Sequence, residues 1–228
     1  MSKANVGCRI STKFERPSKE LVELFLKHAS SNIADCMNRT AAVCSAIRPI
    51  NKTKLLGPAF TVKVAQGDNL MFHKAMDLAQ PGDVIVIDAG GMSDRAIFGE
   101  IMATYCRKRG IAGIIVDGDI RDCAELAEMD IAIYARGANP NGPYKNGPGE
   151  IGTVISFGGQ VVHPGDIIVG DADGIVVIRP ADAKALAAKV DAVLKKEQET
   201  MQIIDRNGTF DRPWMDAKLA EIGCEYLD

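Results

Sequence analysis

The chain has 228 residues, of which 46% are hydrophobic and 25% charged, a composition typical of soluble globular proteins. With 27 basic and 30 acidic residues, the net charge of −3 argues against a nucleic-acid binder that works through bulk charge. The sequence contains neither the roughly 20-residue apolar run that spans a bilayer nor a signal peptide, so we expect a cytoplasmic protein that binds no nucleic acid and no membrane.

The first two thirds of the chain alternate between helical and strand-like patterns. In chain order we expect helical structure over 17–40 with a break near Ser30, then strand 57–65, helix 69–79, strand 83–89, helix 99–110, strand 111–118, helix 121–129 and strand 131–137. The middle of this series runs β-α-β-α-β, which predicts parallel strands joined by right-handed crossovers.

The last third reads differently. Residues 138–150 are rich in glycine, proline and asparagine and predict a loop. Short β segments at 152–159, 166–171 and 174–180 are separated by glycine turns, which favours antiparallel pairing. A long helix is expected from Pro180 to about Asn207, followed by a weakly patterned tail. Because no linker or repeat interrupts the chain, we expect one α/β domain over residues 1–228.

Charged residues gather where two of the parallel strands end, at 88–91 and 117–122. Ligands of open α/β sheets bind beyond such carboxyl ends. Arg121 could bind an anion through two bonds, and Asp122 could hold Mg²⁺ or Mn²⁺. The nearby helix could bind the same anion through the N–H groups of its first turn, at Gly99, Glu100, Ile101 and Met102.

A purely structural interpretation of these charges competes with the functional one. Asp119 or Asp122 could cap the helix that follows, and Arg121 could pair with Glu125 one turn further on. An Arg-Asp pair alone does not decide between the two interpretations.

Three longer stretches carry a resemblance to a known family. They are "DLAQPGDVIVIDAGG", "GEIMATYCRKRGIAGIIVDGDIRD" and "VVHPGDIIVGDADGIVVI", and in this order they resemble the RraA-like family. That family contains the 4-hydroxy-4-methyl-2-oxoglutarate / 4-carboxy-4-hydroxy-2-oxoadipate aldolases and the regulator of ribonuclease activity A. The resemblance implies a swivelling β/β/α fold of three layers and a homotrimer or homohexamer.

The resemblance also implies roles for the charged residues. In the family's aldolases, the Gly-Glu-x-x segment and the arginine bind the pyruvate moiety of the substrate, and the following aspartate anchors the metal. The matching positions here are Gly99, Glu100, Ile101, Met102, Arg121 and Asp122. Glu125 fits the aldolase pattern better than that of the regulator.

The implied activity is a lyase that depends on a divalent cation, Mg²⁺ or Mn²⁺. It would cleave 4-hydroxy-2-oxo dicarboxylic or tricarboxylic acids to pyruvate, with oxaloacetate decarboxylation as a side activity. Because the tail beyond residue 205 departs from the aldolase pattern, the substrate stays open. The alternative is a non-enzymatic regulator that binds a ribonuclease.

Glu197 is a further candidate for the site. It falls within an apolar helical stripe that contains Leu186, Val190, Val193, Leu194, Met201 and Ile204. A carboxylate on a buried face needs a partner, unless the end of the helix frays and leaves it in water. The family's aldolases complete their site with a glutamate from a neighbouring subunit, and the stripe makes Glu197 our choice for that role.

Other reactive side chains are expected to be structural. Lys63 could form a Schiff base, but the alternation of its strand points it outward. His73 and His163 are expected to be structural, and the six cysteines to be free thiols. The spacing of the three histidines indicates no zinc site.

Overall fold

The computed structural model describes residues 5–227, apart from the side chains of Met92 and Ser93. The chain divides into two compact units, Met1–Val190 and Asp191–Asp228, and each is described by itself. None of the helices in the described range is both long enough and apolar enough to cross a membrane.

Four parallel strands form the centre of the main sheet of the first unit. They are β3 (Leu55–Val64), β4 (Val84–Ala96), β5 (Gly113–Ile120) and β6 (Ala132–Ala135). Three helices connect them: α3 (Leu70–Leu78), α4 (Glu100–Lys108) and α5 (Cys123–Ala127). This confirms the predicted parallel β-α-β-α-β portion.

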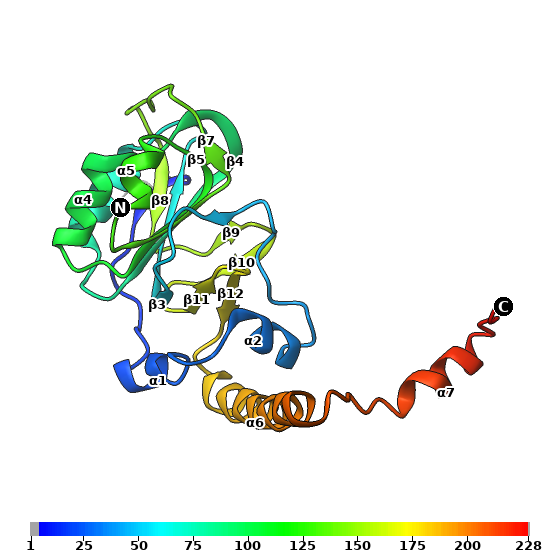
Figure 1. Cartoon of the computed structure of the whole chain (residues 1–228). Coiled ribbons are helices and arrows are strands. Elements are labelled where there is room, and N and C mark those ends of the chain that lie inside the picture. Colours follow the sequence, from blue (N-terminus) through cyan, green and yellow to red (C-terminus); the bar gives the residue numbers. More distant parts are fainter. Residues whose placement is uncertain (1–4, 228) are drawn as a thin grey trace. The chain divides into compact units, whose positions relative to one another are not determined.

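Both faces of this sheet are buried, which explains why its strands are continuous apolar runs. On β4, Ile85 and Ile87 belong to the apolar cluster formed with α3, α4 and α5. Val84 and Val86 belong to a second cluster, formed with the short strands of the last third of the unit. The helices, the sheet and these strands are therefore three layers, and Figure 1 shows α4 and α5 together on one side of the sheet.

The remaining strands are short. The segments over 152–180 form two antiparallel pairs, β9 with β10 and β11 with β12, as the sequence predicts. The bounds of the short strands are β1 (Cys8–Ile10), β2 (Arg48–Pro49), β7 (Gly137–Ala138), β8 (Gly149–Ile151), β9 (Ile155–Phe157), β10 (Gln160–Val162), β11 (Ile167–Asp171) and β12 (Gly174–Ile178).

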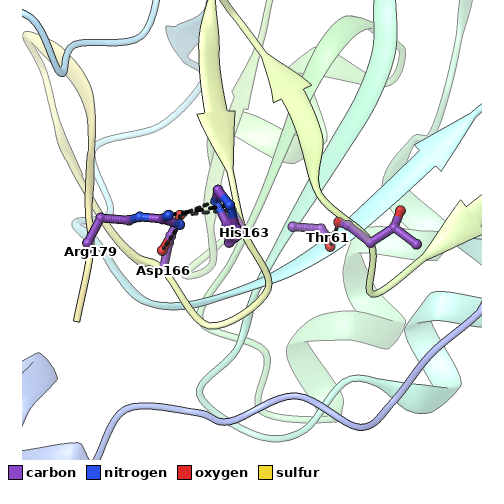
Figure 2. Close-up of polar contacts among 5 residues, drawn as sticks. Thr61, His163, Asp166 and Arg179 are labelled. Atoms are coloured by element: carbon purple, nitrogen blue, oxygen red, sulfur yellow. Dashed lines mark hydrogen bonds and ion pairs between the residues drawn. The ribbon is translucent and has the colours of Figure 1, made fainter. Parts of the chain in front are cut away.

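A buried carboxylate holds the turn between β10 and β11. Figure 2 shows Arg179 and His163 gathered on Asp166, which is 2% exposed. Asp166 accepts a bond from the backbone N–H of His163 at 2.8 Å and one from Arg179 Nη1 at 3.2 Å. The same figure shows Thr61 of β3, whose Oγ1 donates to the carbonyl of Thr153 at 2.6 Å. These contacts agree with the structural role expected for His163.

Several predicted boundaries are wrong. Strand β4 does not end at Gly90–Gly91, because both glycines adopt positive φ angles and the strand resumes after a register shift. The predicted loop 138–150 contains the start of β8, which pairs with β1 and β3. In the helical region 17–40, the predicted break near Ser30 is present and α2 (Ser30–Cys36) follows it, but the helix before the break is limited to α1 (Lys19–Glu23).

The second unit is helical and has no core of its own. The predicted long C-terminal helix is present as α6 (Ala183–Asn207), and α7 (Trp214–Glu221) lies in the tail, where the sequence predicted no element. Burial along the stripe of α6 ends at Val190, Glu197 is exposed, and none of the described residues 191–227 is buried.

Candidate active site

The backbone after β5 turns sharply at Asp122 and so aims two charged side chains at one place. The N–H of Arg121 donates to the carbonyl of Phe98 at 3.0 Å, which ties this turn to the segment before α4. Asp122 itself adopts the left-handed conformation, with φ 59° and ψ 43°. Aspartate is one of the few residues that tolerate this region, so the sequence and the local geometry agree.

The carboxylate of Asp122 reaches across to the start of α4. Its Oδ2 accepts a bond from the N–H of Glu100 at 3.0 Å, where the helix end favours negative charge. A Cβ at Gly99 would lie 2.1 Å from the same oxygen. Residue 99 is therefore a glycine because any side chain would displace this carboxylate.

These contacts bear on the structural interpretation of the charges. Asp122 stands at the N-cap position of α5, but its side chain makes no capping bond to that helix. Arg121 Nε lies 3.8 Å from Asp122 Oδ2, both side chains are partly exposed, and no salt bridge joins Arg121 to the described side chain of Glu125. One expectation changes, because the N–H of Glu100 binds Asp122 instead of an external anion.

A cavity of about 210 Å³ opens beside this pair. It is smaller than the roughly 300–1,000 Å³ of drug-sized pockets, so it suits a small metabolite. Its walls combine predicted and unpredicted residues: Asn69, His73, Phe98, Gly99, Ile101, Met102, Arg121, Asp122, Pro143 and Lys145. Glu100 does not line it, and Glu197 belongs to the second unit.

Sequence reasoning missed three polar residues of this cavity. Asn69 is 2% exposed and donates through Nδ2 to the carbonyl of Ile97 at 2.8 Å, while its Oδ1 has no hydrogen-bond partner within the described range. Burial lowers the pKa of His73, and the charge of Lys145 lowers it further. His73 is therefore a neutral polar group near pH 7, and Lys145 is the second cation of the cavity after Arg121.

The missed residues come from two segments that the sequence separates widely. Asn69 and His73 begin α3, within the "GDNL" stretch and one turn after it, whereas Lys145 lies in the loop after β7. The "GDNL" stretch marks Asn69 as a candidate N-cap residue, which by itself gives no signal for a site. The approach of Lys145 depends on long-range folding and left no local pattern.

The residues present fit a hard divalent cation held largely by water. Within the described range, no three His, Cys, Asp or Glu side chains come together as a metal-binding group. Asp122 is the carboxylate at the cavity, and the unpaired Oδ1 of Asn69 is a second oxygen acceptor in its wall. Carboxylate and neutral oxygen donors with several waters are what Mg²⁺ and Mn²⁺ accept.

The fold and the cavity together define a class of protein, an α/β protein with a small cavity at the carboxyl edge of its parallel strands. The chain belongs to the RraA-like family, since the family model described as "Aldolase/RraA" matches residues 30–177.

Individual relatives agree with this assignment. A protein of Halalkalibacterium halodurans named "Putative 4-hydroxy-4-methyl-2-oxoglutarate aldolase" is 46% identical over 147 residues, which cover 64% of this chain and 70% of that protein. The RNA-processing inhibitor RraA from Thermus thermophilis superposes with a TM-score of 0.62 at 26% identity, over 67% of this chain and 93% of that one. An uncharacterized protein from Pseudomonas syringae shares the fold, with a TM-score of 0.76 at 21% identity over 86% of this chain and 97% of that one.

Proposed function

We propose that this chain is a divalent-metal-dependent lyase that cleaves 4-hydroxy-2-oxo dicarboxylic or tricarboxylic acids and releases pyruvate. Oxaloacetate decarboxylation is its side activity. The observation that carries the proposal is the contact of Asp122 with the start of α4, which the missing side chain of Gly99 permits. This contact places the carboxylate of Asp122 beside the guanidinium of Arg121 in the wall of a small cavity.

The reaction asks the site to accept negative charge. Breaking the C3–C4 bond takes the proton of the 4-hydroxyl and leaves the electron pair on the three-carbon fragment. Arg121 neutralises part of that charge, and the first turn of α4 at Ile101 and Met102 binds the carboxylate of the fragment. Asp122 would hold a divalent cation, which would supply Lewis-acid stabilisation of the same charge.

Two alternatives use different parts of the molecule. A metal-free aldolase would need Lys63 as its Schiff base, but Lys63 is exposed on β3 and does not line the cavity. A regulator of a ribonuclease would need no cavity chemistry, and the likeness to the Thermus inhibitor is its support. The Arg121–Asp122 cavity favours the metal-dependent lyase over both.

The decisive experiment is a panel of 2-oxo acids scored by pyruvate release. We expect release from 4-hydroxy-4-methyl-2-oxoglutarate and from oxaloacetate with Mg²⁺ or Mn²⁺ present, loss of activity with EDTA, and recovery when the metal is returned. If activity survives EDTA and borohydride traps a covalent adduct of enzyme and substrate, the metal-free mechanism with Lys63 as the Schiff base would be correct instead. No release from any acid, together with inhibition of a ribonuclease, would establish the regulator.

Glu197 is proposed to complete the site from a second copy of the chain in a homotrimer or homohexamer. Glu197 is exposed on α6, and at a neighbour's Arg121–Asp122 site its carboxylate would move a proton. It would also make the two units parts of one functional domain.

Subunit mixing tests this shared site. Glu197→Gln should lose activity while the oligomer stays intact. Mixing it with inactive Asp122→Ala subunits should then restore part of the activity. Full activity of Glu197→Gln alone, or no recovery after verified subunit exchange, would refute the shared site.

A further inference from the structure

One wall of the cavity is a loop rather than a helix or strand. Residues 139–147 follow β7 and contribute Pro143 and Lys145 to the lining. Gly142 in the same loop approaches Arg121 so closely that a Cβ there would lie 3.2 Å from Nη1. The position of this loop therefore determines how much room remains between Arg121 and Lys145.

Arg95, near the end of β4, holds the loop at two points. Its Nη1 donates to the carbonyl of Gly142 at 3.0 Å, and its Nη2 donates to the hydroxyl of Tyr144 at 2.8 Å. The guanidinium also stacks on the Tyr144 ring, 4.1 Å from its centroid. The two bonds flank Pro143, so a single planar group fixes the part of the loop that faces the cavity.

The far end of the loop has a separate and deeper anchor. Asp68 is 3% exposed and accepts bonds from the backbone N–H groups of Asn146 and Gly147, the second at 3.0 Å. Its other oxygen accepts from the N–H of Leu70 at 2.8 Å, at the start of α3. Because Asp68 is buried and serves two segments, it fixes where the loop ends, whereas the partly exposed Arg95 adjusts the span before that end.

We propose that Arg95 is a positioning residue that sets the reach of the cavity between Arg121 and Lys145, and hence the length of acid that fits. The proposal rests on the proposed function for its substrate class. The main chain of Arg121 is held by its own bond to Phe98, although its guanidinium lies beside Gly142, so the half of the site that binds the two-carbon head of the acid depends less on Arg95 than the distal half does. The binding of the distal carboxylate, which extends toward Lys145, depends on Arg95.

A binding titration with two uncleaved acids separates these halves. Oxalate fills only the head position, whereas 2-oxoglutarate has the length of the proposed substrate but no 4-hydroxyl, so it cannot undergo retro-aldol cleavage. Both are titrated calorimetrically into the full-length protein with Mg²⁺ present. In Arg95→Lys, which keeps the charge but loses the fork, we expect the Kd of 2-oxoglutarate to rise about tenfold while that of oxalate changes much less.

Two further variants sharpen the test. Tyr144→Phe keeps the ring and removes one of the two bonds, so it should weaken 2-oxoglutarate by about threefold, less than Arg95→Lys. Arg109→Lys is the matched control, because Arg109 also donates to a carbonyl, that of Ala79 at 3.1 Å, and also approaches a tyrosine ring, but does not line the cavity. It should change neither affinity.

Turnover gives an independent readout. In Arg95→Lys, we expect KM for the hydroxy acid to rise and kcat to stay close to that of the wild type, because binding reach is lost but the reacting groups are not. Equal weakening of both acids, or none, overturns the role of Arg95. If the wild type binds both acids but releases no pyruvate, only the proposed function falls, and if it binds neither, both proposals fall.

Discussion

Two Arg-Asp pairs lie at the carboxyl end of β5, and they serve different purposes. Asp117 is buried, accepts a short bond from Arg136 Nε and another from the N–H of Gly158 at 3.0 Å, so fixed donors satisfy both of its oxygens. The pair of Arg121 and Asp122 is looser, with 3.8 Å between its charged atoms, and borders a cavity. The comparison teaches that the residue types alone do not mark the site. The candidate site is distinguished by its openness to a cavity and by the incomplete pairing of its charges.

The end of β4 supports the same lesson. Burial raises the pKa of Asp88, and the N–H of Gly90 opposes that rise by donating to the carboxylate at 3.0 Å. From the sequence, Asp88 is as good a site candidate as Asp117 or Asp122, because it also lies where a parallel strand is expected to end. It is absent from the wall of the cavity, however, because the chain continues as strand beyond it.

The strongest test of the difference between the two pairs is to neutralise the aspartate of each pair in turn. Asp122→Asn keeps an acceptor for the Glu100 N–H but removes the charge that would anchor a cation in the proposed lyase, so kcat/KM should fall about 1,000-fold with little change in stability. Asp117→Asn should do the opposite, lowering the free energy of unfolding by about 3 kcal/mol while the remaining folded enzyme stays active. Pyruvate release and urea unfolding measure the two effects. If both substitutions affect the same quantity, the pairs do not differ in the way proposed here.

Gly99→Ala should give the next largest effect. The added Cβ cannot coexist with Asp122 Oδ2 at 2.1 Å, so the carboxylate must shift by about 1 Å, which can cost about 100-fold in rate. We expect the activity to recover in part at high Mn²⁺, since the defect lies in anchoring the cation. Gly82→Ala is a control of the same chemical change at a glycine where a Cβ would meet nothing within 4 Å, although its positive φ carries a stability cost of its own. Wild-type kinetics in Gly99→Ala would show that the close approach is not needed.

Arg121→Lys should give the smallest of the three effects on catalysis. It keeps the charge but loses the planar fork, and we expect kcat/KM to fall at least about tenfold, because a charge-assisted hydrogen bond contributes roughly 1.5–3 kcal/mol. Stability should not change, because Arg121 is partly exposed and its backbone bond remains. A lysine variant with normal kinetics would make Arg121 a surface residue.

The sequence predicts the layered core well and the site in part. Strands β4 and β5 could be recognised because each is buried on both faces and so consists of an unbroken apolar run. The predicted end of β4 at Gly90 and Gly91 was wrong, since glycines with positive φ are as compatible with a bulge as with the end of a strand.

The reach of side chains across the fold could not be predicted. Two contacts join segments more than 20 residues apart: the bond from the N–H of Glu100 to Asp122, and the bond from Arg95 to the loop that carries Lys145. Glu197 shows the converse, because a helical stripe identifies a face but not what covers it. In this chain the buried part of that face ends at Val190.

The left-handed backbone of Asp122 also limits what redesign of this scaffold can achieve. At φ 59°, aspartate and asparagine are tolerated, whereas a cysteine introduced as a softer ligand would have to bear the torsional strain as well as displace the Glu100 contact. Of the two tolerated residues, only aspartate brings a charge. For the proposed lyase, the turn after β5 would therefore favour an oxygen ligand over a thiolate at this position, and a variant that places a cysteine there would first have to rebuild that turn.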